Sequence, residues 1–483
     1  MSKVFSNIKS GVVWSFLQIF ASKFSTIIGQ LLLAYILNPE DFGKVSIATS
    51  IIYIISLFQN IGISDILISR GKYFSIYTQS ARSISLVTGF ICLTVTLICG
   101  KVSEFIYHDQ DVSNFIYLSC ISIFFNTLSN IPESELKKQL KFKKLSILKS
   151  IENLSTQIFI VLFAYIGFKS YSFIYSSIII SIFHFFYIHK IAKYSYFFEI
   201  KFKYWKSLIH NSIWGLIFNI TQTLIRQVDY LILGVFSTQK AVGLYFMAYT
   251  LSTQTISLVI NIINPILFPI FKSSSQLTTK ERNNNIIELS EVFSFIGFTF
   301  SISQVYILPP IIDLFLEEKW FNSIEITQIL LWGMGFKIAS TLWTLIYKVN
   351  SDFIKLGKVS LISSIIFTLI ITFSSYKFGN IGTAYGVSFY NVISSYVFLY
   401  VAFSNNNITS KKILFSITRD FLQCSFFFIV VNYVIRYFNF DNKYVIILLN
   451  ITTTLVVLFS FTLTYKKNII VTKIKNRIKN KIK

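Results

Sequence analysis

The stretch that decides the fold is residues 210–249, HNSIWGLIFNITQTLIRQVDYLILGVFSTQKAVGLYFMAY. It matches the stretch two hundred residues earlier without a gap, over about forty residues. The aligned identities are Trp14 with Trp214, Gly43 with Gly243, and Ala48 with Ala248. Chance identity in an apolar chain is the alternative, but an ungapped register favours a true internal repeat. Such repeats set the fold, and in membrane carriers they mark two halves around a shared site.

Composition places the chain among membrane proteins. Of its 483 residues, 53% are hydrophobic and 13% are charged, and the mean hydropathy is +0.62. A soluble domain carries about 25% charged residues. We therefore expect an all-α polytopic membrane protein. The four cysteines lie in apolar runs without ligand spacing, which predicts buried, reduced thiols.

Apolar runs long enough to cross a bilayer of about 30 Å recur along the whole chain. The first run is too long for the core of a signal peptide, so we expect it to be retained as the first helix. The fourteen expected spans are 10–37, 44–68, 80–100, 113–131, 147–167, 170–190, 207–235, 241–268, 286–309, 321–347, 353–375, 380–403, 413–437 and 443–465.

Basic residues indicate the orientation of these spans. With the N-terminus in the cytoplasm, 32 of the 44 Lys and Arg residues fall in or beside the inner segments and 8 fall at the outer loops. This asymmetry predicts that both termini are cytoplasmic. The net charge of +23 therefore reflects loops that flank spans, and we expect no nucleic-acid partner.

The repeat predicts the domain organisation. Six spans separate the two copies, so both copies have the same orientation, as in a parallel repeat. We expect an N-lobe at 1–206, a C-lobe at 207–412, two added helices at 413–465 and a basic cytoplasmic tail at 466–483. The tail could form an amphipathic helix on anionic lipid or remain a solvated segment.

Motifs of enzymes are missing from the sequence. It contains no GxxxxGK[ST] and no HExxH, and its four histidines and four cysteines do not form a metal set. The outer loops are too short to fold as a catalytic domain. We therefore expect a transporter with no cofactor and no metal.

Charges inside the expected spans are the candidate binding residues, because an ionised group in the bilayer usually faces a cavity or a partner. Lys23 lies nine residues past Trp14, and Arg226 lies twelve residues past Trp214. At 1.5 Å per residue, the two bases lie about 14 and 18 Å above equivalent tryptophans. This spacing predicts two cations at similar depth near the middle of the membrane.

Neighbouring polar residues extend this predicted site. Gln222, Arg226 and Asp229 share one face of their helix, Gln30 shares a face with Lys23, and Lys337 is a third base in the second lobe. Cations around one cavity would favour an anionic cargo, and guanidinium suits phosphate. The alternatives are that Arg226 and Asp229 neutralise each other and that Lys337 extends towards the interface.

Six pieces of the sequence resemble the polysaccharide-transporter branch of the multidrug/oligosaccharidyl-lipid/polysaccharide exporter superfamily, and in particular its colanic-acid and O-antigen exporters. The pieces are Gly11–Ser15 (GVVWS), Leu31–Gly43 (LLLAYILNPEDFG), Ile61–Arg70 (IGISDILISR), Arg226–Gly234 (RQVDYLILG), Gly243–Ala248 (GLYFMA) and Pro265–Pro269 (PILFP). The family often has arginine where Tyr35 stands, so one basic contact differs here.

The resemblance implies two six-helix lobes around a central cavity, with two further helices. It also implies a flippase that moves undecaprenyl-pyrophosphate-linked oligosaccharide, such as an O-antigen, capsule or exopolysaccharide unit, from the inner to the outer leaflet of a bacterial inner membrane by alternating access. The resemblance also allows a polysaccharide polymerase as a protein partner. We expect the protein itself to be a monomer. The rival interpretations are a cation-coupled drug antiporter of the same superfamily and a membrane polysaccharide polymerase.

Overall fold

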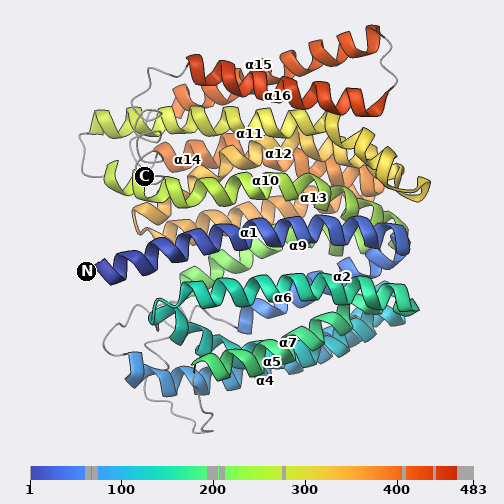
Figure 1. The fold of residues 1–483 in the computed structure, drawn as a ribbon, viewed down its shortest axis with the longest axis vertical. Coiled ribbons are helices and arrows are strands. Elements are labelled where there is room, and N and C mark those ends of the chain that lie inside the picture. Colours follow the sequence, from blue (N-terminus) through green and yellow to red (C-terminus); the bar gives the residue numbers. More distant parts are fainter. Residues whose placement is uncertain are drawn as a thin grey trace. The chain divides into compact units, whose positions relative to one another are not determined.

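The computed structural model describes residues 2–59, 67, 74–192, 205, 213–274, 279–404, 410–438 and 442–464. All the elements assigned among these residues are helices, and no strand occurs among them (Figure 1). This confirms the expected all-α class. The elements are α1 (Ser2–Ile36), α2 (Pro39–Ser56), η1 (Leu57–Gln59), α4 (Phe74–Tyr107), α5 (Gln110–Lys138), α6 (Phe142–Phe163), η3 (Ala164–Phe168), α7 (Tyr171–Ala192), α9 (Ile213–Phe236), α10 (Gln239–Ser274), α11 (Thr279–Phe315), η4 (Glu318–Trp320), α12 (Asn322–Val349), α13 (Phe353–Ile393), η5 (Ser394–Phe398), α14 (Leu399–Ser404), α15 (Ser410–Tyr437) and α16 (Lys443–Thr464).

Ten segments of the described chain are long and apolar enough to cross a membrane. One of them, Phe353–Ser404, has 52 residues. At 1.5 Å per residue it would be about 78 Å long as one straight helix, more than twice a bilayer core of about 30 Å. Gly379 divides it, with φ 59° and ψ −140°, a conformation that glycine adopts most easily. The break supports the two spans expected there, and the total of fourteen stays a prediction.

A second glycine has the same function between α6 and α7. Gly167 has φ 104° within η3, and nothing lies within 4 Å of the position where a Cβ would be. The constraint at this turn is therefore the backbone angle and not crowding. The short turn joins the two helices that were expected as spans 147–167 and 170–190.

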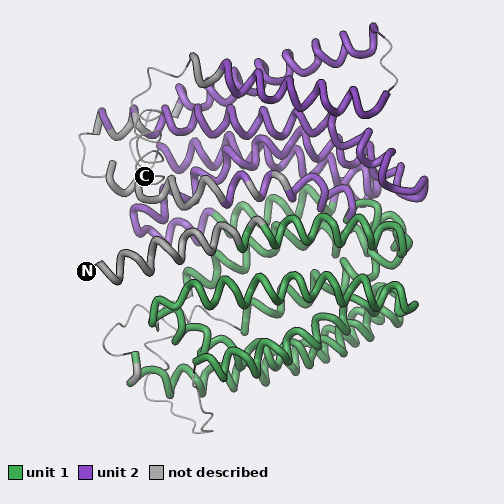
Figure 2. The backbone as a smooth tube through the Cα atoms, viewed as in Figure 1, with its two compact units in different colours: residues 1–246, 360–372 green, residues 247–359, 373–483 purple. Residues whose placement is uncertain are grey.

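The chain forms two compact units (Figure 2). Unit 1 comprises residues 1–246 and 360–372, and unit 2 comprises residues 247–359 and 373–483. The expected division into 1–206, 207–412 and 413–465 stays a prediction, and the expected tail at 466–483 lies outside the described residues.

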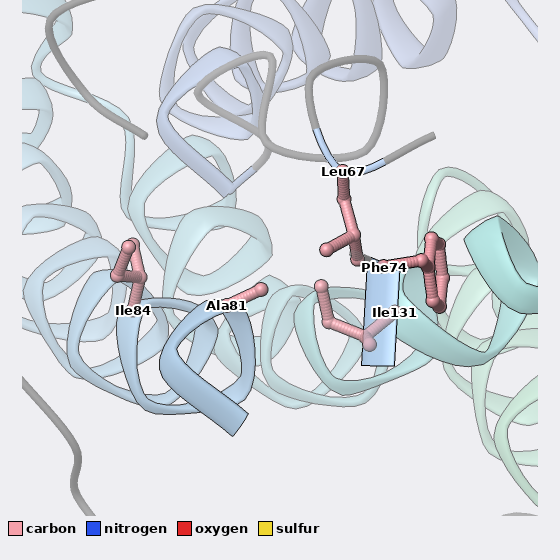
Figure 3. Close-up of a cluster of buried hydrophobic side chains, with 5 residues drawn as sticks. All are labelled: Leu67, Phe74, Ala81, Ile84 and Ile131. Carbon is pink, nitrogen blue, oxygen red and sulfur yellow. The ribbon is translucent and has the colours of Figure 1, made fainter. Parts of the chain in front are cut away.

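In unit 1, α4 packs along α5, α1 along α6, α5 along α7, and α2 along α9. One buried apolar cluster joins α4, α5 and a short segment before α4 (Figure 3). Trp205 packs against the cluster and its Nε1 donates to Ser83 Oγ at 3.0 Å. Lipid is as apolar as these side chains, so close packing and buried hydrogen bonds hold such helices together. The members of the cluster are Leu67, Phe74, Ala81, Ile84 and Ile131.

In unit 2, α11 packs against α12, α15 and α16. A Cβ at Gly335 would lie 2.4 Å from the Phe298 ring, so the glycine lets α12 approach α11 closely. Asn432 on α15 and Asn450 on α16 exchange side-chain amide hydrogen bonds at 3.0 and 3.4 Å. The amide pair fixes the register of the two C-terminal helices in an apolar surrounding.

Candidate functional site

Lys23 lies on α1, where its side chain is half-buried. The adjacent residue, Ser22, accepts a hydrogen bond at 2.7 Å from Asn153 Nδ2 on α6. Thr26, one turn further, donates to the Ser22 carbonyl at 2.8 Å. Polar groups therefore accompany Lys23 along the seam between α1 and α6.

Gln30 continues this polar seam two turns after Lys23. Its Oε1 is buried and has no hydrogen-bond partner among the residues that the structure describes. The preceding Gly29 faces α6, because a Cβ there would lie 2.2 Å from Gln157 Oε1. A buried carbonyl oxygen without a donor is costly in protein and costlier in lipid, so Gln30 is suited to accept a hydrogen bond from a polar ligand or water.

On α9, Arg226 is exposed and its Nη2 donates to Thr223 Oγ1 at 2.9 Å. Gln222, one turn earlier, is half-buried. An arginine on the surface of a membrane helix needs water or a polar partner, because lipid alone is a poor environment for guanidinium.

Asp229 is fully buried, unlike Arg226 one turn before it. Its Oδ2 accepts a hydrogen bond at 2.7 Å from the Tyr245 hydroxyl, and its Oδ1 accepts one at 3.0 Å from the Tyr230 N–H. Asp229 therefore ties α9 to the first turns of α10.

Lys337 lies on α12 in unit 2 and is half-buried. Its Nζ donates to the Tyr249 hydroxyl at 3.3 Å and lies 5.5 Å from the centre of that ring. Hydroxyl and π-face both stabilise the ammonium at this position.

The starts of α2 and α10 meet in a reciprocal contact within unit 1, which we call the glycine junction (Gly43, Gly243, Pro39 and Gln239). A Cβ at Gly43 would lie 1.9 Å from the Gln239 carbonyl oxygen, and a Cβ at Gly243 would lie 1.7 Å from the Pro39 carbonyl oxygen. The pairs are equivalent under the two-hundred-residue offset, so each copy of the repeat offers the same patch to the other. Such self-complementary contact is what a two-fold relation produces.

Charged and polar side chains surround one end of the glycine junction. Asp109 Oδ2 accepts from Gln239 Nε2 at 2.5 Å and lies 3.2 Å from Lys44 Nζ. Lys44 also pairs with Asp111 at 2.5 Å, and the Tyr171 hydroxyl donates to Asp111 Oδ1 at 3.0 Å. These groups join the ends of α2, α5, α7 and α10.

The ionisation of Asp109 reflects this setting. Burial raises the pKa of the carboxyl, but hydrogen bonds from the Val112 N–H, Gln239 and Lys44 outweigh it, so the pKa lies below its ordinary value. Asp109 therefore remains a carboxylate and can hold Gln239 and Lys44 at neutral pH.

Two pockets open beside the glycine junction, with volumes of about 470 and 450 Å³. Glu40 contributes to both pockets. The first is lined by Glu40, Ile47, Tyr107, Gly234, Ser237, Thr238, Gln239 and Lys240. The second is lined by Asn38, Glu40, Asp41, Lys44, Asp111, Gly167, Phe168, Lys169, Ser170, Tyr171 and Tyr175.

Five of the six expected binding residues belong to unit 1, and Lys337 belongs to unit 2. A cavity shared by Lys23 and Arg226 stays a prediction. Sequence reasoning missed the Asp109–Gln239 contact and a partly buried pair, His184 with Glu152. The matched register around Gly43 and Gly243 could have indicated the first. No sequence signal marks the second, because it depends on how α6 and α7 face each other.

The fold is that of a helical, multi-pass membrane transporter. The structure of the lipid II flippase MurJ in an inward closed conformation aligns with TM-score 0.73 at 17% identity, over 95% of this chain and 99% of that one. An inward-facing multidrug resistance MATE family transporter of the MOP superfamily aligns with TM-score 0.63 at 11% identity, over 80% and 94%. The Vibrio cholerae MATE transporter VcmN in its bent form aligns with TM-score 0.52 at 11% identity, over 86% and 99%.

The sequence places the chain more narrowly. It belongs to the polysaccharide biosynthesis protein family, whose model matches residues 32–325. No curated protein matches it significantly. The resemblance to the polysaccharide branch of the exporter superfamily is thereby confirmed.

Proposed function

We propose that this protein is a flippase for polyprenyl-pyrophosphate-linked oligosaccharide. The observation that carries the proposal is the alignment of 95% of the chain with a lipid II flippase, in a chain of the polysaccharide biosynthesis family. Lipid II is itself a lipid-linked saccharide, so the fold and the family agree on one chemical class of cargo. The glycan would be a unit of an O-antigen, capsule or exopolysaccharide.

The charged residues supply the chemistry that such a cargo needs. A pyrophosphate cannot enter the bilayer core bare, because burying unpaired charge is prohibitive. Lys23 and Arg226 would bind the headgroup, Lys337 would add a third positive charge, and Gln30 and Gln222 would hydrogen-bond oxygens or water. Guanidinium and ammonium groups both bind phosphate oxygens, Arg in a bidentate manner. Asp229 would keep α9 in position through Tyr245.

The glycine junction supports an alternating-access mechanism. With both termini in the cytoplasm, the junction lies at the outer face and closes the exit. Headgroup and sugars would enter from the cytoplasmic side, while the polyprenyl chain remains in lipid. Separation of α2 from α10 would then release them outside.

The test is a deletion strain in the natural host. We expect it to lose surface polysaccharide and to accumulate the completed lipid-linked unit on the inner leaflet. Accumulation of single units on the outer leaflet, unpolymerised, would instead assign the protein as a polymerase. Normal surface polysaccharide would refute the proposal.

A drug antiporter is the second candidate, because the alignment with MATE transporters also spans most of the chain. It predicts that the deletion strain becomes sensitive to cationic drugs while its surface polysaccharide is unchanged. Asp229 would be its coupling acid, although its hydrogen bond to Tyr245 favours a structural function.

A further inference from the structure

A histidine and a glutamate meet between two helices of unit 1, away from the predicted binding residues. Nδ1 of His184 on α7 contacts the Glu152 carboxylate on α6. The side chains are 12% and 16% exposed, so both ionisable groups are largely removed from solvent.

Both residues lie deep within their helices. Glu152 is ten residues from the start of α6 and eleven from its end, and His184 is thirteen residues from the start of α7 and eight from its end. At 1.5 Å per residue, each is at least about 12 Å from a helix end. Within the expected spans 147–167 and 170–190, Glu152 lies five residues from one end and His184 lies six, about 8 and 9 Å inside the spans. Ionisable groups inside a membrane span usually serve ion binding or proton transfer.

A neighbouring cluster on α5 and α6 shows what a permanent ion pair looks like. Glu133 on α5 contacts Lys137 and Lys149, both at 3.0 Å. Lysine keeps its charge at any physiological pH. Within the described part of the chain, the ion-pair partner of Glu152 is His184, whose side chain is charged only when it is protonated.

We propose that His184 and Glu152 form a proton-binding site that is coupled to cargo movement; this inference rests on the proposed flippase function. The imidazole and the carboxylate together hold one proton in the neutral state of the pair. Without that proton, a neutral imidazole faces a carboxylate and the pair has net charge −1, so proton uptake changes the net charge of the pair from −1 to 0. No other reactant is needed, because the proton comes from water on one side of the membrane and returns to water on the other.

The pair is connected to the predicted headgroup site through α6 and α1. Asn153, the residue after Glu152, donates to Ser22, the residue before Lys23. A positive charge added at the pair would strengthen the attraction of this region for an anionic headgroup. By linkage, a bound headgroup would equally favour proton uptake.

Other charged groups on α6, on α7 and on the helices that pack against them also affect the protonation of the pair. They include Lys23 on α1, His189 and Lys190 on α7, and the other charged residues of α5 and α6: Asp111, Glu133, Glu135, Lys137, Lys138, Lys143, Lys144 and Lys149. His189 is the other histidine on α7, and its Nδ1 contacts the Phe185 carbonyl at 2.6 Å. It is therefore the matched control on the same helix.

The first experiment measures proton binding directly. In a full-length protein with His108, His189 and His210 replaced by Gln, ¹⁵N-histidine NMR in lipid nanodiscs reports His184 alone. Spectra are recorded from pH 5 to 8, and we expect the His184 signals to change with pH and this change to shift in the added Glu152→Gln variant. A signal that does not change over this range would overturn the proposal, because a structural pair keeps one protonation state.

The second experiment measures coupling. Proteoliposomes receive undecaprenyl pyrophosphate carrying one fluorescent sugar, and the flipping rate is followed from pH 5.5 to 8. We expect the wild-type rate to change about tenfold, within the range typical of coupled sites. His184→Gln and Glu152→Gln should flip the probe at a rate independent of pH, while His189→Gln keeps the wild-type profile.

A wild-type pH profile in both variants of the pair would overturn the proposal. Wild-type protein that flips no probe at any pH would count against the proposed flippase function instead, and the NMR titration would then decide the proton site by itself. The NMR experiment also decides if either variant of the pair fails to fold.

Discussion

A methyl group at the glycine junction should force the exit open. In Gly243→Ala, the new Cβ would lie 1.7 Å from the Pro39 carbonyl oxygen and 2.6 Å from its carbon. Neither atom belongs to a flexible side chain, so the backbones of α2 and α10 must separate by more than an ångström. Gly43→Ala produces the same conflict with Gln239 from the other copy of the repeat, at 1.9 Å.

The size of the effect follows from the overlap. Overpacking of a close contact costs about 1–3 kcal/mol. If this cost destabilises the closed form and not the open form, the equilibrium shifts towards the open form by about 5- to 150-fold, since about 1.4 kcal/mol corresponds to a factor of ten. Both alanine variants should therefore populate the open form much more often.

A buried thiol behind the junction can report this opening. Ser50 lies seven residues past Gly43, is fully buried, and donates to Gln227 Oε1 at 2.9 Å. In a background with the four native cysteines replaced by Ser, Ser50→Cys should react slowly with a membrane-impermeant maleimide added outside. Added Gly243→Ala should raise that labelling rate about 5- to 150-fold.

Gly215→Ala is the matched control, because nothing lies within 4 Å of its added Cβ. It should leave the labelling rate unchanged. Equal labelling of Ser50→Cys with and without Gly243→Ala, in folded protein, would show that the junction does not close the exit.

Three further predictions concern single contacts. Replacing Tyr245 by Phe leaves the buried Asp229 carboxylate without its hydroxyl donor and should lower the free energy of unfolding by about 1–3 kcal/mol. The measurement is the melting temperature in detergent, which should fall; an unchanged temperature would contradict this. Because the pKa of Asp109 is depressed, its stabilisation should be complete above the pKa of an unfolded Asp, about 3.9, and be lost as the pH falls through the lower folded value. Asp109→Asn should remove this loss of stability at acid pH from the pH dependence of the melting temperature, and its persistence in the variant would assign it to another group. Replacing Lys23 and Arg226 together by Gln should abolish polysaccharide export while expression is retained; normal export would exclude them as the headgroup site.

Much of the fold could be predicted from the sequence, because the bilayer restricts the chain to helices that satisfy their own backbone. The matched register around Gly43 and Gly243 predicted a repeat, and these glycines turn out to contact each other's copies. The break at Gly379 falls in the gap that the sequence left between the expected spans 353–375 and 380–403, but the backbone angles of the glycine leave no mark in hydropathy.

The side-chain contacts were less predictable. Arg226 and Asp229 were expected on one face from their spacing, yet Asp229 is fully buried and Arg226 is exposed. A helix turns about 100° per residue, so three positions separate two side chains by about 60°, enough for one to face a neighbouring helix. His184 and Glu152 are 32 residues apart in the sequence, and they are in contact only because α6 and α7 pack with these two faces together.

The most direct test of the flippase is transport by the purified protein in vesicles. An undecaprenyl-pyrophosphate-linked oligosaccharide is placed in the inner leaflet, and a membrane-impermeant glycosidase outside measures how much becomes accessible with time. We predict that vesicles with the protein expose the glycan much faster than vesicles without it, and that the unlinked oligosaccharide is not transported. Equal exposure in both kinds of vesicle would contradict the account.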